Sequence, residues 1–146
     1  MNMSKLMDII FICSSIIFNI SVSVFYIAVK LGNMVLMQVS GAIVISLIIP
    51  FTITLLGYMK EKAEKRMIIS HVFILFYLFL ELLLDYILKI PFREILAIHV
   101  PYIIVFYAAM FSMIGVSFEK NKKMGSIVIV TFLILIGCLI YYLLPF

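Results

Sequence analysis

Two acidic residues, Glu81 and Asp85, lie four positions apart within an otherwise apolar stretch at 67–90. Residues four apart share one face of a helix, one turn from each other. A carboxylate at the centre of a bilayer costs about 2.5–3.5 kcal/mol on insertion scales, so such residues usually face protein or water and mark proton or ion sites. The chemistry that this pair indicates is the binding of a proton or another cation.

Other polar side chains are expected at the same depth as this pair. Asp85 and His99 are equally far from Phe92, so a turn there places them at matching heights on two neighbouring helices. The same reasoning puts Tyr102 level with Glu81. Polar residues in the outer halves of the first two apolar stretches reach this depth as well. We therefore expect an outward-opening polar cavity lined by Asn19, Gln38, Glu81, Asp85, His99 and Tyr102.

A purely structural interpretation competes for several of these residues. Asp85 can pair with Lys89 one turn away or with His99 across the turn. Asn19 can serve as an interhelical hydrogen bond, worth about 0.6 kcal/mol on average. Glu81 is deeper and has no opposite charge one turn away in the sequence. It is the strongest functional candidate.

The elements that position these residues follow from composition. Apolar residues make up 66% of the 146 positions, charged residues only 12%, and the mean hydropathy is +1.32. Soluble domains are about half apolar and about a quarter charged. The chain is therefore predicted to be a single transmembrane domain, 1–146, for which the lipid bilayer is the solvent. The net charge of +4 is attributed to membrane topology, and no nucleic-acid partner is expected.

Short charged clusters divide the chain into apolar runs that each exceed the roughly 20 residues needed to cross a bilayer. Continuous apolar runs indicate helices and not barrel strands. The predicted fold is an all-α bundle of five transmembrane helices with short loops and no obvious break within any span. The predicted spans are 6–29, 34–59, 67–90, 95–118 and 124–146.

The distribution of basic residues predicts the orientation of this bundle. Eight Lys and Arg residues fall on the side of the N-terminus and three on the other side. Cytoplasmic loops hold the excess of positive charge. The N-terminus is thus predicted to be cytoplasmic and the C-terminus outside, in a multi-pass protein of the plasma membrane. The basic loop at 60–66 holds four Lys and Arg residues, which is the smallest number expected of a lipid-recognition cluster.

Turns and prolines refine the span ends. The turn at 30–33 contains Gly32 and Asn33, the residue types most tolerant of positive φ. The third helix is expected to end near Pro91, because a proline pushes the preceding residue out of the helical region. Pro50 and Pro101 are either kinks that widen a cavity or prolines tolerated within a membrane helix.

Motifs for the common chemistries are missing. There is no HExxH, GxSxG, Gly-rich phosphate loop or CxxC, so no cofactor or metal is expected, and a non-enzymatic role is favoured. Cys13 and Cys138 lie at different heights and are predicted to remain free. His71 and His99 are about 24 Å apart along the membrane normal and cannot share one ligand.

Three functions remain open. The first is a proton- or cation-linked carrier or ligand-binding protein that uses Glu81 and Asp85. The second is a non-catalytic interaction or assembly subunit, within a homo-oligomer or a larger membrane complex. The third is a lipid-modifying enzyme with an Asp85/His99 pair, which lacks a nucleophile or metal motif. A stripe of small residues that permits close helix approach is assigned to internal packing in preference to a homodimer: Ala108, Ser112 and Gly115.

Overall fold

The computed structural model describes residues 3–62, 64–89 and 95–145, and in these ranges the chain is helical apart from short connections. Five helical segments are long and apolar enough to cross a membrane, which confirms the all-α prediction and the five apolar stretches. The elements are α1 (Met3–Leu31), α2 (Met34–Ser46), α3 (Ile48–Lys60), α4 (Lys65–Glu81), the π-helix η1 (Leu82–Ile87), α5 (Leu96–Lys120) and α6 (Lys122–Leu143).

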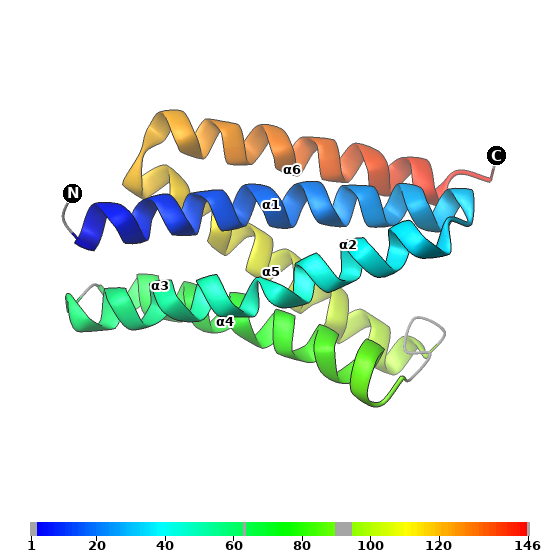
Figure 1. Cartoon of the computed structure of the whole chain (residues 1–146), viewed down its shortest axis with the longest axis horizontal. Helices are drawn as coiled ribbons and strands as arrows, with labels where there is room; N and C mark the ends of the chain where they lie inside the picture. The colour runs from blue at the N-terminus through cyan, green and yellow to red at the C-terminus, as the bar shows by residue number, and fades with distance from the viewer. Residues whose placement is uncertain (1–2, 63, 90–94, 146) are drawn as a thin grey trace.

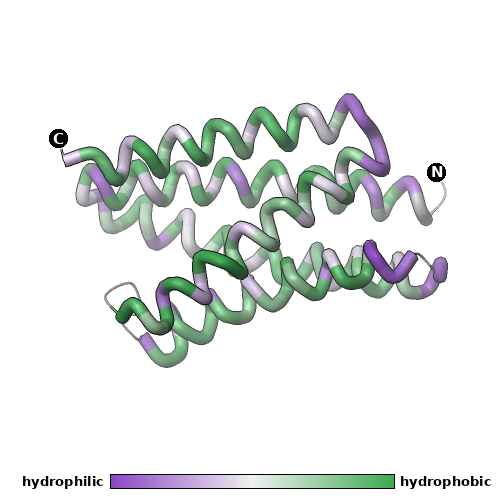
Figure 2. The backbone as a smooth tube through the Cα atoms, turned by 180° about the vertical axis from the view of Figure 1, so that it is seen from behind, coloured by the Kyte–Doolittle hydropathy of each residue, from purple (hydrophilic) through white to green (hydrophobic). Residues whose placement is uncertain are grey.

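Helix α1 is central to the bundle and contacts α2, α3, α5 and α6 (Figure 1). Helix α6 packs along one side of α1, the α2–α3 segment and α4 lie on the other side, and α5 crosses behind α1 and packs against both α4 and α6. Hydrophilic segments are concentrated at the end of the bundle that holds the N-terminus, whereas the helix middles are mostly hydrophobic (Figure 2). The structure thus gathers at one end the basic segments that the sequence places on one side.

The core is built mainly from aromatic and aliphatic side chains between the helices. Phe11, Phe18, Phe51 and Leu78 are fully buried, while many other large apolar side chains are exposed, as expected when lipid covers the outer surface. The hydroxyl of the buried Ser15 donates to the Phe11 carbonyl oxygen at 3.0 Å, so it is satisfied within its own helix.

The second span is interrupted, contrary to the expectation that no span contains a break. Helix α2 ends at Ser46 and α3 begins at Ile48, with Leu47 between them. Pro50 has no N–H group and cannot donate to the carbonyl of Ser46, the usual acceptor four residues earlier. The amide of Leu47 is shared between the carbonyls of Ile43 (3.3 Å) and Val44 (3.2 Å). Of the two interpretations of Pro50, a kink or a tolerated proline, this interruption favours the kink.

The third span also departs from the expected regular helix. After Glu81 the chain continues as the π-helix η1, and the amide of Leu88 donates to the carbonyl of Leu83, five residues earlier, at 2.8 Å. The regular turns end at Ile87, before the predicted limit of 90. Residues 90–94, with the predicted helix end at Pro91, lie outside the described residues. Short π segments occur frequently at functional sites.

The turn between α1 and α2 forms as predicted. Gly32 has φ +70°, and the side chain of Asn33 accepts from the amide of Leu36 at 3.1 Å, which caps α2. At the other end of the bundle, Asn121 caps α6 by accepting from the amides of Lys123 and Met124. Both connections join antiparallel helices.

Candidate functional site

A cavity of about 270 Å³ opens between α1, α2, α4, η1 and α5. Four of the six residues predicted to line a polar cavity line this one: Gln38, Glu81, Asp85 and Tyr102. Aromatic rings make up much of the remaining wall, from Phe25, Tyr26, Tyr77 and Tyr86. The site thus combines two carboxyl groups with several rings, one amide and apolar side chains.

Glu81 lies at the end of α4, at the junction with the π-helix, and is half-buried. Its Oε2 accepts from the hydroxyl of Tyr102 on α5 and, at 3.3 Å, from the hydroxyl of Tyr77 one turn earlier on α4. The two hydroxyl oxygens are 3.1 Å apart. Tyr77 and Tyr102 are 2% and 8% exposed, so this three-oxygen cluster is largely shielded from the surroundings of the bundle.

The number of protons in this cluster depends on the state of Glu81. Three oxygen–oxygen contacts connect the carboxyl group and the two hydroxyls. With Glu81 ionised, the cluster holds two hydroxyl protons for three contacts. A proton on Glu81 supplies the third, so that each contact then contains one proton. Ionised Glu81 can therefore accept from both hydroxyls, and a protonated Glu81 can in turn donate within the cluster.

The π-helix sets the position of the second carboxyl group. Asp85 projects from η1 into the cavity and is half-buried. The following residue, Tyr86, lies against Gly41 of α2 so closely that a Cβ at Gly41 would overlap the Tyr86 hydroxyl. Because glycine has no side chain, the Tyr86 hydroxyl reaches the backbone of α2 there, and the two residues close one side of the cavity. Gln38, on the same helix as Gly41, is exposed at the cavity wall.

Two of the predicted residues lie elsewhere, which corrects the expected cavity lining. Asn19 is buried and donates to Thr131 Oγ1 at 2.9 Å and to the Val128 carbonyl at 3.4 Å. Asn19 therefore links α1 to α6, and its side chain points away from the cavity. His99 is half-buried outside the lining residues, and its ring stacks on that of Tyr102 with centroids 6.3 Å apart. The pairing of Asp85 with Lys89 or His99 stays a prediction.

Several residues of the site were not predicted as lining, although a signal was present for one of them. Tyr77 precedes Glu81 by four residues, the spacing that brings side chains together on a helix. The contributions of Tyr86 and Gly41 carry no such signal, because they depend on the π turn and on the approach of α2. Tyr26 enters the wall from α1.

The remaining sequence candidates lie outside the cavity. His71 is completely buried; its Nδ1 donates to the Met67 carbonyl at 2.8 Å, and its Nε2 lies 3.1 Å from Thr54 Oγ1. Both ring nitrogens of His71 thus have a polar neighbour inside the bundle. Cys13 and Cys138 are both free, as predicted. Among the residues that the structure describes, no group of three His, Cys, Asp or Glu side chains is arranged to hold a metal ion.

The small-residue stripe does not pack internally along its whole length. Ala108 and Ser112 are half-buried, but Gly115 is exposed, and a Cβ added there would meet no atom within 4 Å. Ser112 and Gly115 instead line a hollow of about 380 Å³ on the outside of the bundle. The assignment to internal packing therefore fails at Gly115.

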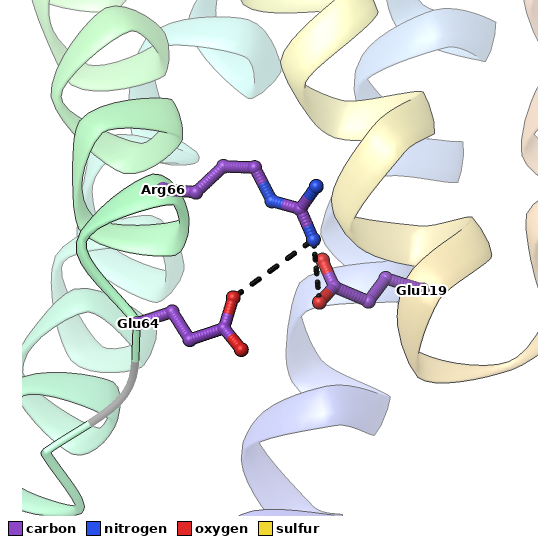
Figure 3. A network of polar contacts seen from close by, with 3 residues as sticks. All are labelled: Glu64, Arg66 and Glu119. Atoms are coloured by element: carbon purple, nitrogen blue, oxygen red, sulfur yellow. Dashed lines mark ion pairs between the residues drawn. The ribbon is translucent and has the colours of Figure 1, made fainter.

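An ion-pair network borders this hollow (Figure 3). Arg66 at the start of α4 lies 2.8 Å from Glu119 at the end of α5 and 3.9 Å from Glu64. All three side chains are substantially exposed, so each pair contributes little to stability, typically about 0–1 kcal/mol. The network joins the basic loop at 60–66 to α5 and neutralises part of its charge.

Comparison with known proteins adds no relative: no protein-family model matches the chain, and neither a curated protein nor a solved structure shows significant similarity to it. The fold and the composition define the class of the molecule, a helical protein with five segments suited to cross a membrane.

Proposed function

We propose that the chain is a small membrane carrier or ligand-binding protein that takes up protons or other cations at the cavity around Glu81 and Asp85. The observation that carries this proposal is the three-oxygen cluster of Glu81, Tyr77 and Tyr102, which can accommodate Glu81 with or without a proton. Intramembrane carboxyl groups commonly mark proton and ion pathways. Tyrosine rings beside carboxyl groups also favour a positively charged ligand through cation–π attraction.

The orientation of the carrier forms part of the proposal. Cytoplasmic loops hold the excess of positive charge, and eight of the eleven Lys and Arg residues belong to the segments at the N-terminal end. We assign this end to the cytoplasmic side of a plasma membrane and the C-terminus to the outside. The cavity around Glu81 then lies in the outer half of the bundle.

Transport in proteoliposomes tests this function. The probes are proton movement, followed with a pH-sensitive dye trapped inside the vesicles, and uptake of radiolabelled methylammonium. Glu81→Gln removes the titrating group but keeps the size of the side chain, so we expect flux to fall about tenfold or more, as for loss of a charge-assisted interaction. Glu64→Gln is the matched control, since Glu64 is exposed and far along the chain from the cavity residues. Full flux in correctly inserted Glu81→Gln protein refutes the mechanism.

A second candidate function is that of an assembly subunit. The observation that favours it is the external hollow, where Ser112 and Gly115 leave room for a partner helix. Small residues permit close helix–helix approach within membranes. This function predicts that Gly115→Leu disrupts a complex recovered from the native membrane, whereas Glu81→Gln leaves it intact. The opposite pattern favours the carrier.

A further inference from the structure

A second amphipathic cavity lies at the opposite end of the bundle from Glu81. It has a volume of about 330 Å³ and is enclosed by the start of α1, the end of α5 and the start of α6. Its polar rim comprises Lys5, Asp8, Lys120 and Asn121. These residues come from distant parts of the chain, so the sequence by itself does not bring the two lysines together.

The rim is held in place by a buried tyrosine of α3. The Tyr58 hydroxyl donates to Asp8 Oδ1, and the ammonium group of Lys120 lies 5.2 Å from the centre of the Tyr58 ring. Tyr58 itself is only 1% exposed. The carboxylate at the rim is thus engaged by a hydroxyl donor, and the ammonium group is positioned by a cation–π contact.

Below the rim the cavity wall is apolar. Ile9 and Cys13 follow along the exposed face of α1, and Met124 contributes from the first turn of α6. The outer faces of α1 and α6 carry exposed apolar residues and are therefore expected to contact lipid. The cavity accordingly changes from cationic at the end of the bundle to apolar toward the membrane interior.

We propose that this cavity binds an anionic phospholipid, with the phosphate between Lys5 and Lys120 and an acyl chain along Ile9 and Met124. Basic pockets between transmembrane helices on the cytoplasmic side are a known mode of headgroup binding. Both the charge of the rim and the direction of the polarity change match such a lipid. The proposal is independent of the function assigned to Glu81, but it rests on the cytoplasmic orientation proposed above for this end of the bundle.

The absence of tryptophan from the chain makes a direct test practicable. Ile9→Trp introduces a single reporter at the cavity wall, and Val72→Trp introduces a matched reporter on exposed α4 surface at a similar distance from the same end. Each protein is reconstituted in phosphatidylcholine vesicles that contain increasing amounts of brominated phosphatidylglycerol. Quenching by the brominated lipid then measures its preference for each location.

We expect Ile9→Trp to show about fivefold selectivity for the anionic lipid, as for one lysine attraction near an anionic surface, and Val72→Trp to show almost none. The selectivity should disappear when Lys5→Gln and Lys120→Gln are added and should persist with Lys5→Arg and Lys120→Arg. Removal of two neighbouring charges that do not line the cavity, with Lys122→Gln and Lys123→Gln, should preserve it.

Three results overturn the proposal. Equal selectivity at the two reporters means that no site exists at the cavity. Equal loss with either pair of glutamine substitutions means that diffuse charge, and not the cavity, attracts the lipid. Relief of quenching by added inorganic phosphate means that the rim binds free phosphate in place of a lipid headgroup. Unchanged elution of each variant in detergent, with unchanged emission from the Val72→Trp reporter, serves as the folding control.

Discussion

Removal of one hydroxyl from the Glu81 cluster offers a quantitative test of the site. Tyr102→Phe keeps the ring and deletes the donor to Glu81 Oε2. Hydrogen bonds to charged groups contribute about 1.5–3 kcal/mol, and interhelical hydrogen bonds in membranes reach at most about 1.7 kcal/mol. We therefore expect a loss of about 1.5 kcal/mol in the free energy of unfolding, which is about tenfold in the equilibrium constant.

Neighbouring tyrosines supply graded controls for this loss. Tyr77→Phe removes the 3.3 Å contact to the same oxygen and the 3.1 Å contact to the Tyr102 hydroxyl, and it should cost only about 0.6 kcal/mol. Tyr107→Phe, on the same helix as Tyr102, alters a half-buried ring that packs on Phe106 and Phe111. For the Tyr107 hydroxyl no hydrogen bond is seen within the described residues, so this substitution should leave the free energy of unfolding nearly unchanged.

The assay is reversible unfolding in mixed micelles, combined with a double-mutant cycle that includes Glu81→Gln. A neutral amide is a weaker acceptor than a carboxylate, so the cost of Tyr102→Phe in that background should fall to about 0.6 kcal/mol. The coupling between the two positions is then about 1 kcal/mol. The reasoning is refuted if Tyr102→Phe costs no more than Tyr77→Phe, or if its cost is the same with Glu81→Gln present.

Two further predictions concern other close contacts. Gly41→Ala should displace Tyr86 and lower methylammonium uptake, because the added Cβ overlaps the tyrosine hydroxyl. Gly115→Ala is the control and should have no effect on uptake. Equal uptake by both variants contradicts the closure of the cavity by Tyr86. A double-mutant cycle of unfolding with Asn19→Ala and Thr131→Val should give a coupling energy of about 0.6 kcal/mol, because the two side chains share one interhelical hydrogen bond at 2.9 Å. A coupling energy of zero contradicts this link.

Much of the fold was predictable because the bilayer imposes simple constraints. Length and polarity of a segment decide whether it can cross hydrocarbon, and backbone hydrogen bonding then requires a helix. The five stretches were predicted on these grounds, and the turn at Gly32 was predicted from the tolerance of Gly and Asn for positive φ. The break at Leu47 and the π-helix after Glu81 were not predicted, because both are local rearrangements of hydrogen bonding that hydropathy does not detect. Pro50 carried the one local signal, but prolines are often tolerated in membrane helices.

The depth of the candidate-site residues within the bundle was predictable, but the direction in which their side chains point from each helix was not. Counting residues from a turn gives the height of a side chain, and Glu81, Asp85, Tyr102 and Gln38 do meet at one cavity. The same count placed Asn19 at the right level, yet its side chain points to α6. Rotation about a helix axis depends on the partner helices, which the sequence alone does not place.

The sequence by itself determined that this is a helical chain suited to a membrane, with two carboxyl groups inside an apolar segment. Each of these properties is set by the order of polar and apolar residues along the chain. Only the tertiary structure decided which groups share a site. It joined Glu81 to Tyr102, separated Asn19 from the cavity, and placed Lys5 and Lys120 at the rim of one cavity. The physical reason is that contacts between helices depend on their rotation and crossing, which are set by packing of the whole bundle.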